Sequence, residues 1–422
     1  MVKFNIKLNY FSNEGVVVNN LEETPTIRFI DLFCGIGGFH QAFNSLGLNY
    51  NTKCVLACDK DKPCREIYET NYNIKVTEDI KTLKPEDIPE YDVLCAGFPC
   101  QPFSNAGKKS TFNHDKGLLF DEIMRLIKDY KPKLMFLENV KHILKVSNGE
   151  VFKYVMAKLD ANGYNVQIFK MSPHKYGIPQ QRERIYFACS HKSLTEKEIE
   201  LVEPEKTEII LSNFLQNKEE VPEKYFVTGD VLTALDAWEE MIQKFEYDEK
   251  ISPTIMANEF YKVYTDDEFA NLATWRQDYI TKNKPLYEKY KPHWDEWSEK
   301  HKTILKRREI YAKLEWQVGK IKDNDSIYNY FIQLRQSGIR VKKSKYFPTL
   351  VAMSQIPIYG REKRMITPRE CARIQSFPDS FIIHSEDRQS YKQFGNSVNV
   401  NNVRNVIKST IMAYDNFLQY II

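Results

Sequence analysis

A cysteine between two prolines is the first candidate for chemistry in this sequence. Cys100 lies in the run Gly97 to Ser104, directly after an apolar segment that ends at Ala96. Prolines restrict the backbone on both sides, so the thiol would be held rigidly, which suits a nucleophile. Many cysteines are instead buried structural thiols. Because a core seldom needs two prolines around a cysteine at a strand end, we expect a catalytic role.

A glycine cluster is the second candidate, and its chemistry is ligand binding. Phe33 to Gly38 joins an apolar segment to a helical one. Glycines let the backbone approach a ligand, and a helix start offers free N–H groups. Asp59 ends the next strand, where a carboxylate can accept ribose hydroxyls. The spacing is not GxGxxG, so a mononucleoside such as S-adenosylmethionine fits better than NAD. The alternative is that the glycines serve only a tight turn.

One carboxylate and two guanidinium groups are the remaining candidates for catalytic residues. Glu138 begins the triplet Glu138-Asn139-Val140 at the end of another apolar segment, and Arg182 and Arg184 precede a further one. In a site of low dielectric constant a buried carboxyl keeps its proton to higher pH and can donate it. Surface ion pairs are the alternative for all three residues.

These residues need a scaffold that brings strand ends together, and the sequence predicts one. Short apolar segments at 28–33, 55–58, 91–96, 134–137 and 185–188 read as strands, and helical patterns at 40–46, 119–130 and 151–159 lie between them. Alternating strands and helices predict an α/β domain with a doubly wound, Rossmann-like parallel sheet. Ligands bind at the carboxyl ends of such strands.

The composition sets limits on the whole chain. Its 422 residues suggest two or three domains, and the formal net charge is +3. The eight cysteines show no paired CxxC spacing, so we expect reduced thiols and no metal. There is no membrane-spanning run of about 18 apolar residues, and the first residues do not form the apolar block of a signal peptide. We therefore expect a cytoplasmic protein.

A basic, aromatic segment follows the α/β part. Residues 271–345 hold 18 Lys or Arg against 9 Asp or Glu, and they contain four of the five tryptophans. Basic and aromatic side chains together are typical of a nucleic-acid surface. A solvated helical face with the aromatics in a small core is the equally weighted alternative. We assign residues 199–364 to a second domain.

Sequence patterns typical of helices appear again near the C-terminus. Thr367, Pro368 and Glu370 predict a capped helix start. The last helical segment has one apolar stripe that includes Val403, Ile407 and Ile411 and needs a packing partner. We expect this partner to be the first domain, which would combine residues 1–198 with 365–422.

Taken together, six ordered motifs resemble those of the DNA cytosine-5 methyltransferase family. They are FxGxGG (33–38), GFPCQPFS (97–104), ENV (138–140), QxRxR (180–184), RECARIQSFPDSF (369–381) and GNSV (395–398). The resemblance covers residues 27–195 and 334–400. It implies an S-adenosylmethionine-dependent fold that flips a cytosine out of duplex DNA and methylates carbon 5, leaving S-adenosylhomocysteine.

The resemblance also implies site residues. Cofactor contacts are expected from Phe33, Cys34, Gly35, Ile36, Gly38, Asp59, Lys60, Asp79, Ile80, Gly97, Pro99, Leu119, Asn396, Ser397 and Val398. DNA contacts are expected from Gln101, Ser104, Lys108, Lys109, Arg307 and Arg308. Asp59 stands where the family usually has Glu, and Lys60 where an aromatic residue is frequent, so the adenine wall departs most from the family pattern.

The family mechanism assigns a role to each catalytic residue. Cys100 is the expected thiolate that adds to carbon 6, and Arg184 with nearby backbone donors would lower its pKa. Glu138 would hydrogen-bond ring nitrogen N3 and the exocyclic amine, and Arg182 would hold the base oxygen. No side chain is clearly the base that removes the carbon 5 proton.

Several alternatives stay open. A tRNA cytosine-5 methyltransferase on the same scaffold would carry little between the QxRxR and C-terminal motifs, whereas more than 130 residues lie there in this chain. A non-catalytic DNA-binding subunit would have no use for a presented thiol. An NAD oxidoreductase conflicts with the glycine spacing. We expect a monomer of the restriction-modification type, associated with the nucleoid, with duplex DNA and a separately encoded restriction endonuclease as partners.

Overall fold

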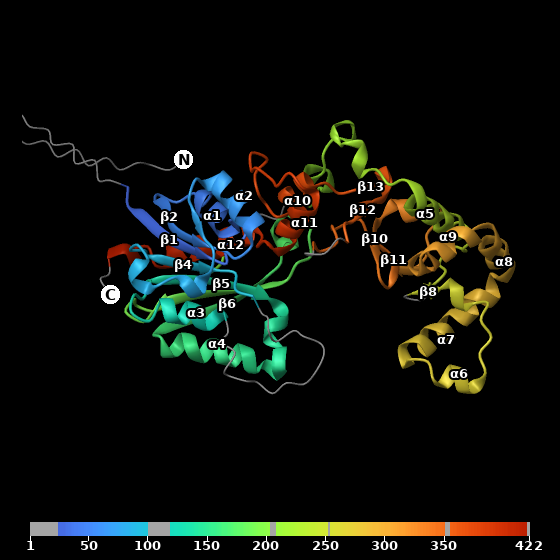
Figure 1. Ribbon diagram of the computed structural model, residues 1–422, viewed down its shortest axis with the longest axis horizontal. Coiled ribbons are helices and arrows are strands. Elements are labelled where there is room, and N and C mark those ends of the chain that lie inside the picture. The colour runs from blue at the N-terminus through green and yellow to red at the C-terminus, as the bar shows by residue number, and fades with distance from the viewer. Residues whose placement is uncertain (1–23, 100–118, 203–207, 252–253, 351–354, 420–422) are drawn as a thin grey trace, which may run out of the picture.

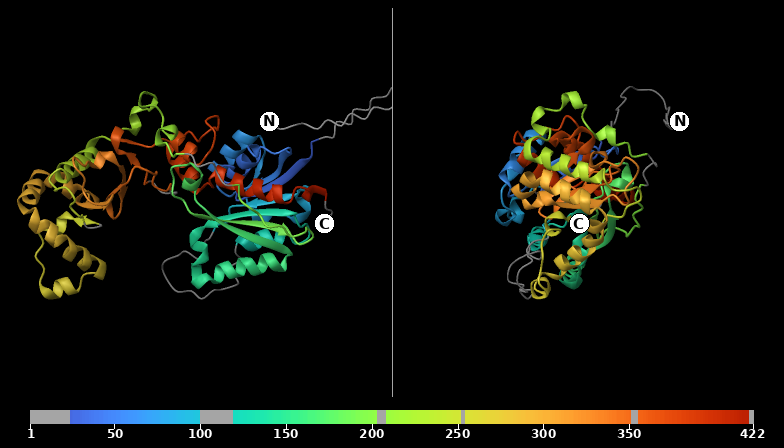
Figure 2. Two further views of the ribbon diagram at one scale, coloured as in Figure 1. Left: turned by 180° about the vertical axis from the view of Figure 1, so that it is seen from behind. Right: turned by 90° about the vertical axis from the view of Figure 1, so that its right-hand side faces the viewer.

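A computed structural model describes residues 24–99, 119–202, 208–251, 254–350 and 355–419. These residues form two lobes, one around each of two sheets, as Figure 1 shows and Figure 2 shows from behind and from the side. Cys100, Gln101, Ser104, Lys108 and Lys109 lie outside the described residues. Within the described ranges, no helix is both long and apolar enough to cross a membrane.

The large lobe alternates strands and helices along the chain. Its elements are β1 (Thr26–Leu32), α1 (Gly38–Asn44), β2 (Asn51–Cys58), α2 (Lys62–Tyr72), β3 (Val76–Thr77), β4 (Val93–Ala96), α3 (Leu119–Leu126), β5 (Leu134–Val140), α4 (Glu150–Ala161), β6 (Tyr164–Met171) and β7 (Arg184–His191). Each of the five predicted strands and three predicted helices is present, with ends that differ by a few residues.

The large sheet has the order β3-β2-β1-β4-β5-β7-β6. The first five strands run parallel, which confirms the predicted doubly wound sheet. The other two are different, because β7 pairs antiparallel with both β5 and β6. Residues 172–183 join β6 to β7 and contain only a short 3₁₀ helix (Pro173–Tyr176), because antiparallel neighbours need no crossover helix. The sequence prediction had β7 in a parallel sheet and missed β3 and β6.

Alternating side chains explain the layers. Along β1, Phe29 points to one apolar cluster and Ile30 to another, because successive strand residues face opposite sides. The first cluster packs against α1 and α2, and the second against α3 and α4. Figure 1 shows these helix pairs on opposite faces of the sheet. The carboxyl ends of β1 and β5 point toward the small lobe in both Figure 1 and Figure 2.

Three C-terminal helices return to the large lobe. They are α10 (Pro368–Ile374), α11 (Asp387–Asn396) and α12 (Val400–Ala413). At the start of α10, Thr367 and Glu370 form the predicted capping box. The buried stripe of α12, which includes Val403, Ile407 and Ile411, packs against α1 and β7. The predicted packing partner of the last helix is therefore confirmed.

The small lobe has its own sheet and core. Its elements are α5 (Gly229–Ile242), β8 (Ile255–Met256), α6 (Asp266–Ala270), α7 (Thr274–Lys289), α8 (Lys291–Lys300), α9 (Lys302–Arg307), β9 (Lys313–Gln317), β10 (Phe331–Arg335), β11 (Gly338–Lys342), β12 (Ile358–Tyr359) and β13 (Arg364–Met365). The strands are ordered β13-β12-β10-β11-β9-β8.

Most of the aromatic segment lies inside this core. Trp294, Trp297 and Trp316 are at most 4% exposed and pack with Trp238, whereas Trp275 is 57% exposed. The predicted role of aromatic rings in contacting nucleic acid is thus wrong for those three tryptophans. Their rings are buried, and they supply much of the apolar surface of a core whose strands are short. The alternative of a small aromatic core is correct for them.

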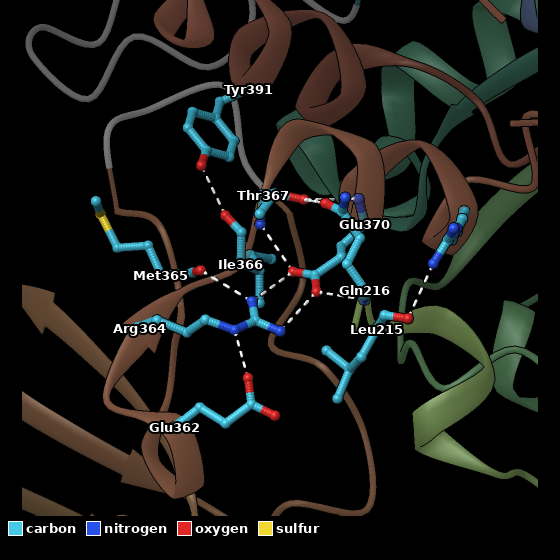
Figure 3. A network of polar contacts seen from close by, with 10 residues as sticks. Leu215, Gln216, Glu362, Arg364, Met365, Ile366, Thr367, Glu370 and Tyr391 are labelled. Atoms are coloured by element: carbon cyan, nitrogen blue, oxygen red, sulfur yellow. Dashed lines mark hydrogen bonds and ion pairs between the residues drawn. The ribbon is translucent and has the colours of Figure 1, made fainter. Parts of the chain in front are cut away.

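A buried ion pair joins the lobes (Figure 3). Arg364, on β13, donates to Glu370, on α10, through two nitrogens at 3.0 and 2.8 Å. Both side chains are fully buried. The N–H groups of Thr367 and Gln216 donate to the same carboxylate at 2.8 and 2.9 Å, and Glu362 accepts from Nε of Arg364 at 2.6 Å. Since a buried charge is tolerated only when it is fully paired, this network fixes where the small lobe leaves the large one.

The proposed boundary at residue 199 remains a prediction. Leu201, Leu211 and Phe214 pack against the apolar cluster of the large lobe. Phe331 and Phe347, from the small-lobe segment, belong to that cluster as well. The lobes therefore share an apolar contact in addition to the ion pair.

Candidate active site

A cavity of about 320 Å³ opens at the carboxyl ends of the parallel strands. It collects side chains from the glycine cluster, from the ends of β2, β4 and β5, and from the segment between α11 and α12. These parts are up to several hundred residues apart in the sequence. The arrangement is the one expected for a ligand site in an open α/β sheet.

The glycine loop has a backbone that few residues other than glycine could adopt. Gly35 and Gly37 have positive φ angles of 53° and 86°. A Cβ atom at Gly37 would lie 2.2 Å from the Tyr72 ring, whose hydroxyl donates to the Gly37 carbonyl at 2.9 Å. A Cβ at Gly38 would lie 2.4 Å from Val398. Glycine is thus needed here for close packing as well as for the turn.

Asp59 ties this loop to the end of β2. Its Oδ2 accepts the Gly35 N–H at 2.7 Å, and its Oδ1 accepts the Asp61 N–H at 2.8 Å. Burial raises the pKa of Asp59, and the two backbone donors oppose that change. The carboxylate also lines the cavity. It therefore holds the loop while facing any bound ligand.

The predicted cofactor residues lie together, with one exception. Every one of them except Ile36 lines the cavity. Ile36 is 2% exposed and packs in the core beneath α1, so the expected contact of its side chain is corrected. Lys60 lies at the rim with a largely exposed side chain, 3.9 Å from the Asp79 carboxylate.

Glu138 lines the cavity, and Arg184 lies directly beside it. Glu138 lies two residues before the end of β5 and is 9% exposed, and its Oε1 lies 3.1 Å from Nε of Arg184 on β7. The antiparallel pairing of β5 with β7 brings these side chains together. Burial raises the pKa of Glu138, and the nearby charges of Arg184 and Arg182 oppose that change. The carboxyl can thus carry a proton in this site more readily than in water.

Arg182 lies elsewhere than predicted. It is 4% exposed and does not line the cavity. Its Nη1 donates to the Leu350 carbonyl at 2.8 Å, and its Nη2 donates to the carbonyls of Gly395 and Ser397 at 2.9 and 3.0 Å. The expected contact with a base oxygen is therefore corrected: these donors hold the end of α11 against the large lobe, and Arg184 is the arginine beside Glu138.

Comparison with known proteins agrees with this geometry. The sequence matches the C-5 cytosine-specific DNA methylase family over residues 27–412. The chain belongs to this family. Type II methyltransferase M.HhaI of Haemophilus parahaemolyticus is 32% identical over 396 residues, which are 93% of this chain and 97% of that protein. Type II methyltransferase M.BanI of Aneurinibacillus aneurinilyticus is 31% identical over 430 residues, covering 90% and 95% of the two chains.

Solved structures support the fold of this DNA methylase. The Dnmt2 methyltransferase of S. pombe has a TM-score of 0.55 and 18% identity, and the match covers 92% of this chain and 99% of that one. At this identity the likeness concerns the fold alone. The family match and the two type II relatives show that the chain is a DNA (cytosine-5) methyltransferase. The alternatives of a tRNA methyltransferase, a silent subunit or an NAD oxidoreductase are therefore not favoured.

The methylase site also contains residues that sequence reasoning missed. Phe39, Cys58, Asp61, Cys64, Glu78 and Gln393 line the cavity. Cys58 and Glu78 each precede a predicted contact by one position, so strand-end neighbours were an available signal. Gln393 lies three residues before Asn396 on α11, which places both on one side of that helix.

The residue before the nucleophile candidate belongs to the described site. Pro99 lines the cavity and immediately precedes Cys100. The Asn139 side chain donates to the Phe98 carbonyl at 2.9 Å, which fixes the start of that loop beside Glu138.

The two predicted DNA-binding arginines of the methylase lie in the small lobe. Nε of Arg307 is 2.6 Å from Asp230, and the Arg307 side chain is 63% exposed. Arg308 lies over the Tyr311 ring at 5.4 Å. Neither residue lines the cavity.

Proposed function

We propose that this DNA methylase holds S-adenosylmethionine in the large cavity and uses Cys100, Glu138 and Arg184 to methylate carbon 5 of a cytosine extruded from duplex DNA. The observation that carries the proposal is that the Asp59 carboxylate, the glycine loop and Glu138 all line one cavity, and that Arg184 pairs with Glu138. One cavity can thus hold the methyl donor and reach the reacting base.

The residues present fit S-adenosylmethionine. A Cβ added at Gly35 would meet no atom within 4 Å, so the loop leaves open space for a ligand. Asp59 offers carboxylate oxygens for ribose hydroxyls, and Phe33 offers an aromatic face for adenine. Asn396, Ser397 and Val398 complete the lining beside the glycine loop. Bound there, S-adenosylmethionine supplies the methyl group that the cytosine carbon takes as S-adenosylhomocysteine departs.

The protein groups activate the base. Carbon 5 of cytosine is a poor nucleophile, so the Cys100 thiolate first forms a bond to carbon 6 and pushes an electron pair toward carbon 5. Glu138 donates a proton or hydrogen bond to N3, which neutralises the charge that develops. After carbon 5 is methylated, a base removes its proton, the ring double bond returns, and the bond from carbon 6 to the Cys100 sulfur breaks.

Arg184 takes the supporting role that the sequence had given to Arg182. Its Nε lies 3.1 Å from Glu138, so its guanidinium stays beside the carboxyl while a base is held there. A planar fork of donors suits a base oxygen. Arg182 supports the reaction indirectly, because its bonds to Gly395 and Ser397 position the segment that carries Asn396.

The chemistry requires a cytosine that has left the base stack. The reaction needs attack on carbons 5 and 6 from opposite faces of the ring, so the base must leave the stack. We propose that the enzyme acts as a monomer on a specific duplex sequence, in the cytoplasm with the nucleoid. A separately encoded restriction endonuclease of the same sequence specificity is the proposed partner.

A mechanism-based trap tests the function. A duplex with 5-fluorocytosine at the target should give a covalent complex that survives denaturing electrophoresis, and only with S-adenosylmethionine, because fluorine cannot leave as a cation. Cys100→Ser should give no such band. If the adduct maps to a different peptide, Cys100 is not the nucleophile. If a methylated substrate gives no band, both the nucleophile and the covalent route are rejected.

A further inference from the structure

The small lobe contains a second cavity, of about 290 Å³. It lies between the start of α7, strands β8 and β9, and the β10–β11 hairpin. Six residues of its lining carry the argument below: Trp275, Tyr279, Glu315, Gln336, Ser337 and Arg340. None of them belongs to the active site described above. The sequence gave a role to none of these positions except the aromatic ones.

Two residues that line this cavity, Glu315 and Arg340, form an ion pair. Glu315 and Arg340 are neighbours on the parallel strands β9 and β11. Nε of Arg340 donates to Oε2 of Glu315 at 2.6 Å, and Gln317 donates to Oε1. Both carboxylate oxygens therefore already accept a hydrogen bond, and the Glu315 side chain is only 11% exposed. This carboxylate positions the arginine.

The two terminal nitrogens of Arg340 have no hydrogen-bond partner within the part of the chain that the structure describes. Among the described residues, Nε is the atom of this guanidinium for which a side-chain or backbone partner is found. Its two terminal nitrogens form a planar pair of donors, and Arg340 lines the cavity. Gln336 and Ser337 are exposed at the tip of the adjacent hairpin.

An exposed indole stands at the edge of the same cavity. Trp275 is 57% exposed, whereas the other four tryptophans, all within the described residues, are at most 4% exposed. It packs edge-on against Tyr279, with ring centroids 5.9 Å apart. The surrounding segment 271–345 has a net charge of +9. An aromatic surface in a basic region suits contact with nucleic acid.

We propose that this cavity contacts the target duplex and that Arg340 recognises a guanine of the target sequence. Two parallel donors match the O6 and N7 acceptors that guanine presents in the major groove. Adenine needs a donor and an acceptor together, and cytosine needs an acceptor, but the oxygens of Glu315 are already engaged. The inference rests on the proposed function, because it names the part of the DNA substrate that the small lobe recognises.

The first experiment compares recognition sequences. Methylation-sensitive sequencing of host DNA gives the sequence that the wild-type enzyme modifies. Arg340→Ala should lower the preference for guanine at one position by about tenfold or more, since one bidentate contact gives that discrimination. Arg340→Lys should also relax that position, because it can keep the charge beside Glu315 but loses the fork. Arg361→Ala, which removes an exposed arginine between β12 and β13 that does not line the cavity, is the matched control and should leave every position unchanged.

The second experiment does not depend on activity. Acrylamide should quench mainly Trp275, and a short duplex that carries the modified sequence should protect it, whereas Trp275→Phe removes the quenchable signal. A folded Arg340→Ala that keeps full preference at every guanine overturns the proposal, and so does a bound target duplex that leaves Trp275 fully quenchable.

The two proposals can fail separately. If the wild-type enzyme produces no 5-methylcytosine, the proposed function fails, and protection of Trp275 by a pool of random-sequence duplexes still decides whether the cavity contacts DNA. If methylation occurs but Arg340 and Trp275 behave as in the overturning outcomes, only the guanine contact is rejected.

Discussion

The two lobes place their chemistry-bearing residues in different ways. In the large lobe, Asp59 directly follows β2 and Glu138 lies in the last three residues of β5, so a short stretch of sequence contains both the strand and the side chain that it positions. In the small lobe, Trp275 and Arg340 are 65 positions apart and meet only through tertiary packing. Function is therefore readable from sequence where one strand end defines a site, and it is not readable where a site forms between distant elements.

Loss of the thiol should have the largest effect on the large-lobe site. Cys100→Ser should lower methyl transfer to below about one thousandth of wild type, because a hydroxyl is not ionised at neutral pH. Binding of S-adenosylmethionine, measured by calorimetry, should persist. Substantial residual activity would show that this strand-end motif had been misinterpreted.

Glu138→Gln should have the next largest effect on activity. We expect kcat to fall about a hundredfold or more with little change in DNA affinity, since the amide keeps the shape but cannot donate the same proton. Because burial raises the pKa of Glu138, its proton is lost, and the wild-type rate should fall, as the pH increases through that raised pKa. This limb of the rate profile should be absent in Glu138→Gln. A variant that retains it would assign the limb to another group.

Two tryptophans separate core from surface within the small lobe. Trp294 is fully buried, so Trp294→Ala should lower the free energy of unfolding by about 3–5 kcal/mol. Trp275 is 57% exposed, so Trp275→Ala should change it by less than about 0.5 kcal/mol. Chemical denaturation of both variants measures the difference. Equal losses would contradict the division of this aromatic segment into a core and an exposed ring.

Arg307 and Arg308 should have the smallest effect. Each phosphate contact that is lost lowers the slope of log affinity against log salt by about 0.9. Arg307 already pairs with Asp230, so we expect the double replacement by alanine to lower the slope by about one contact rather than two. A salt titration of DNA binding measures this slope. No change would indicate that α9 and the residues after it form a solvated surface.

Most of the large lobe could be predicted from sequence for physical reasons. The apolar runs of β1, β4 and β5 are buried on both faces, and such runs read clearly as parallel strands. Strand β3 has two residues and no periodicity, so it was missed. Strand β6 was missed because it is an edge strand without a clear alternation: Asn165 and Gln167 are half-buried, whereas the apolar Ile168 is exposed. The direction of β7 depends on its neighbour β6, which sequence patterns do not reveal.

The site errors have a common origin. Ile36 and Arg182 lie within motifs, and motif membership does not say which side chains face the ligand. The carbonyls that accept hydrogen bonds from Arg182 come from Leu350, Gly395 and Ser397, far away in the sequence. The pairing of Glu138 with Arg184 likewise follows from strand register, which the sequence alone does not give.

The contact between Gly38 and Val398 also has a consequence for biosynthesis. The glycine loop is made early, yet the residue that packs on it follows 360 positions later. At about 5–20 residues per second, a ribosome needs about 20–70 s to translate the intervening chain. The wall of the cavity is incomplete during that interval, so a nascent chain should be unable to modify DNA until α12 has been synthesised and has packed against α1.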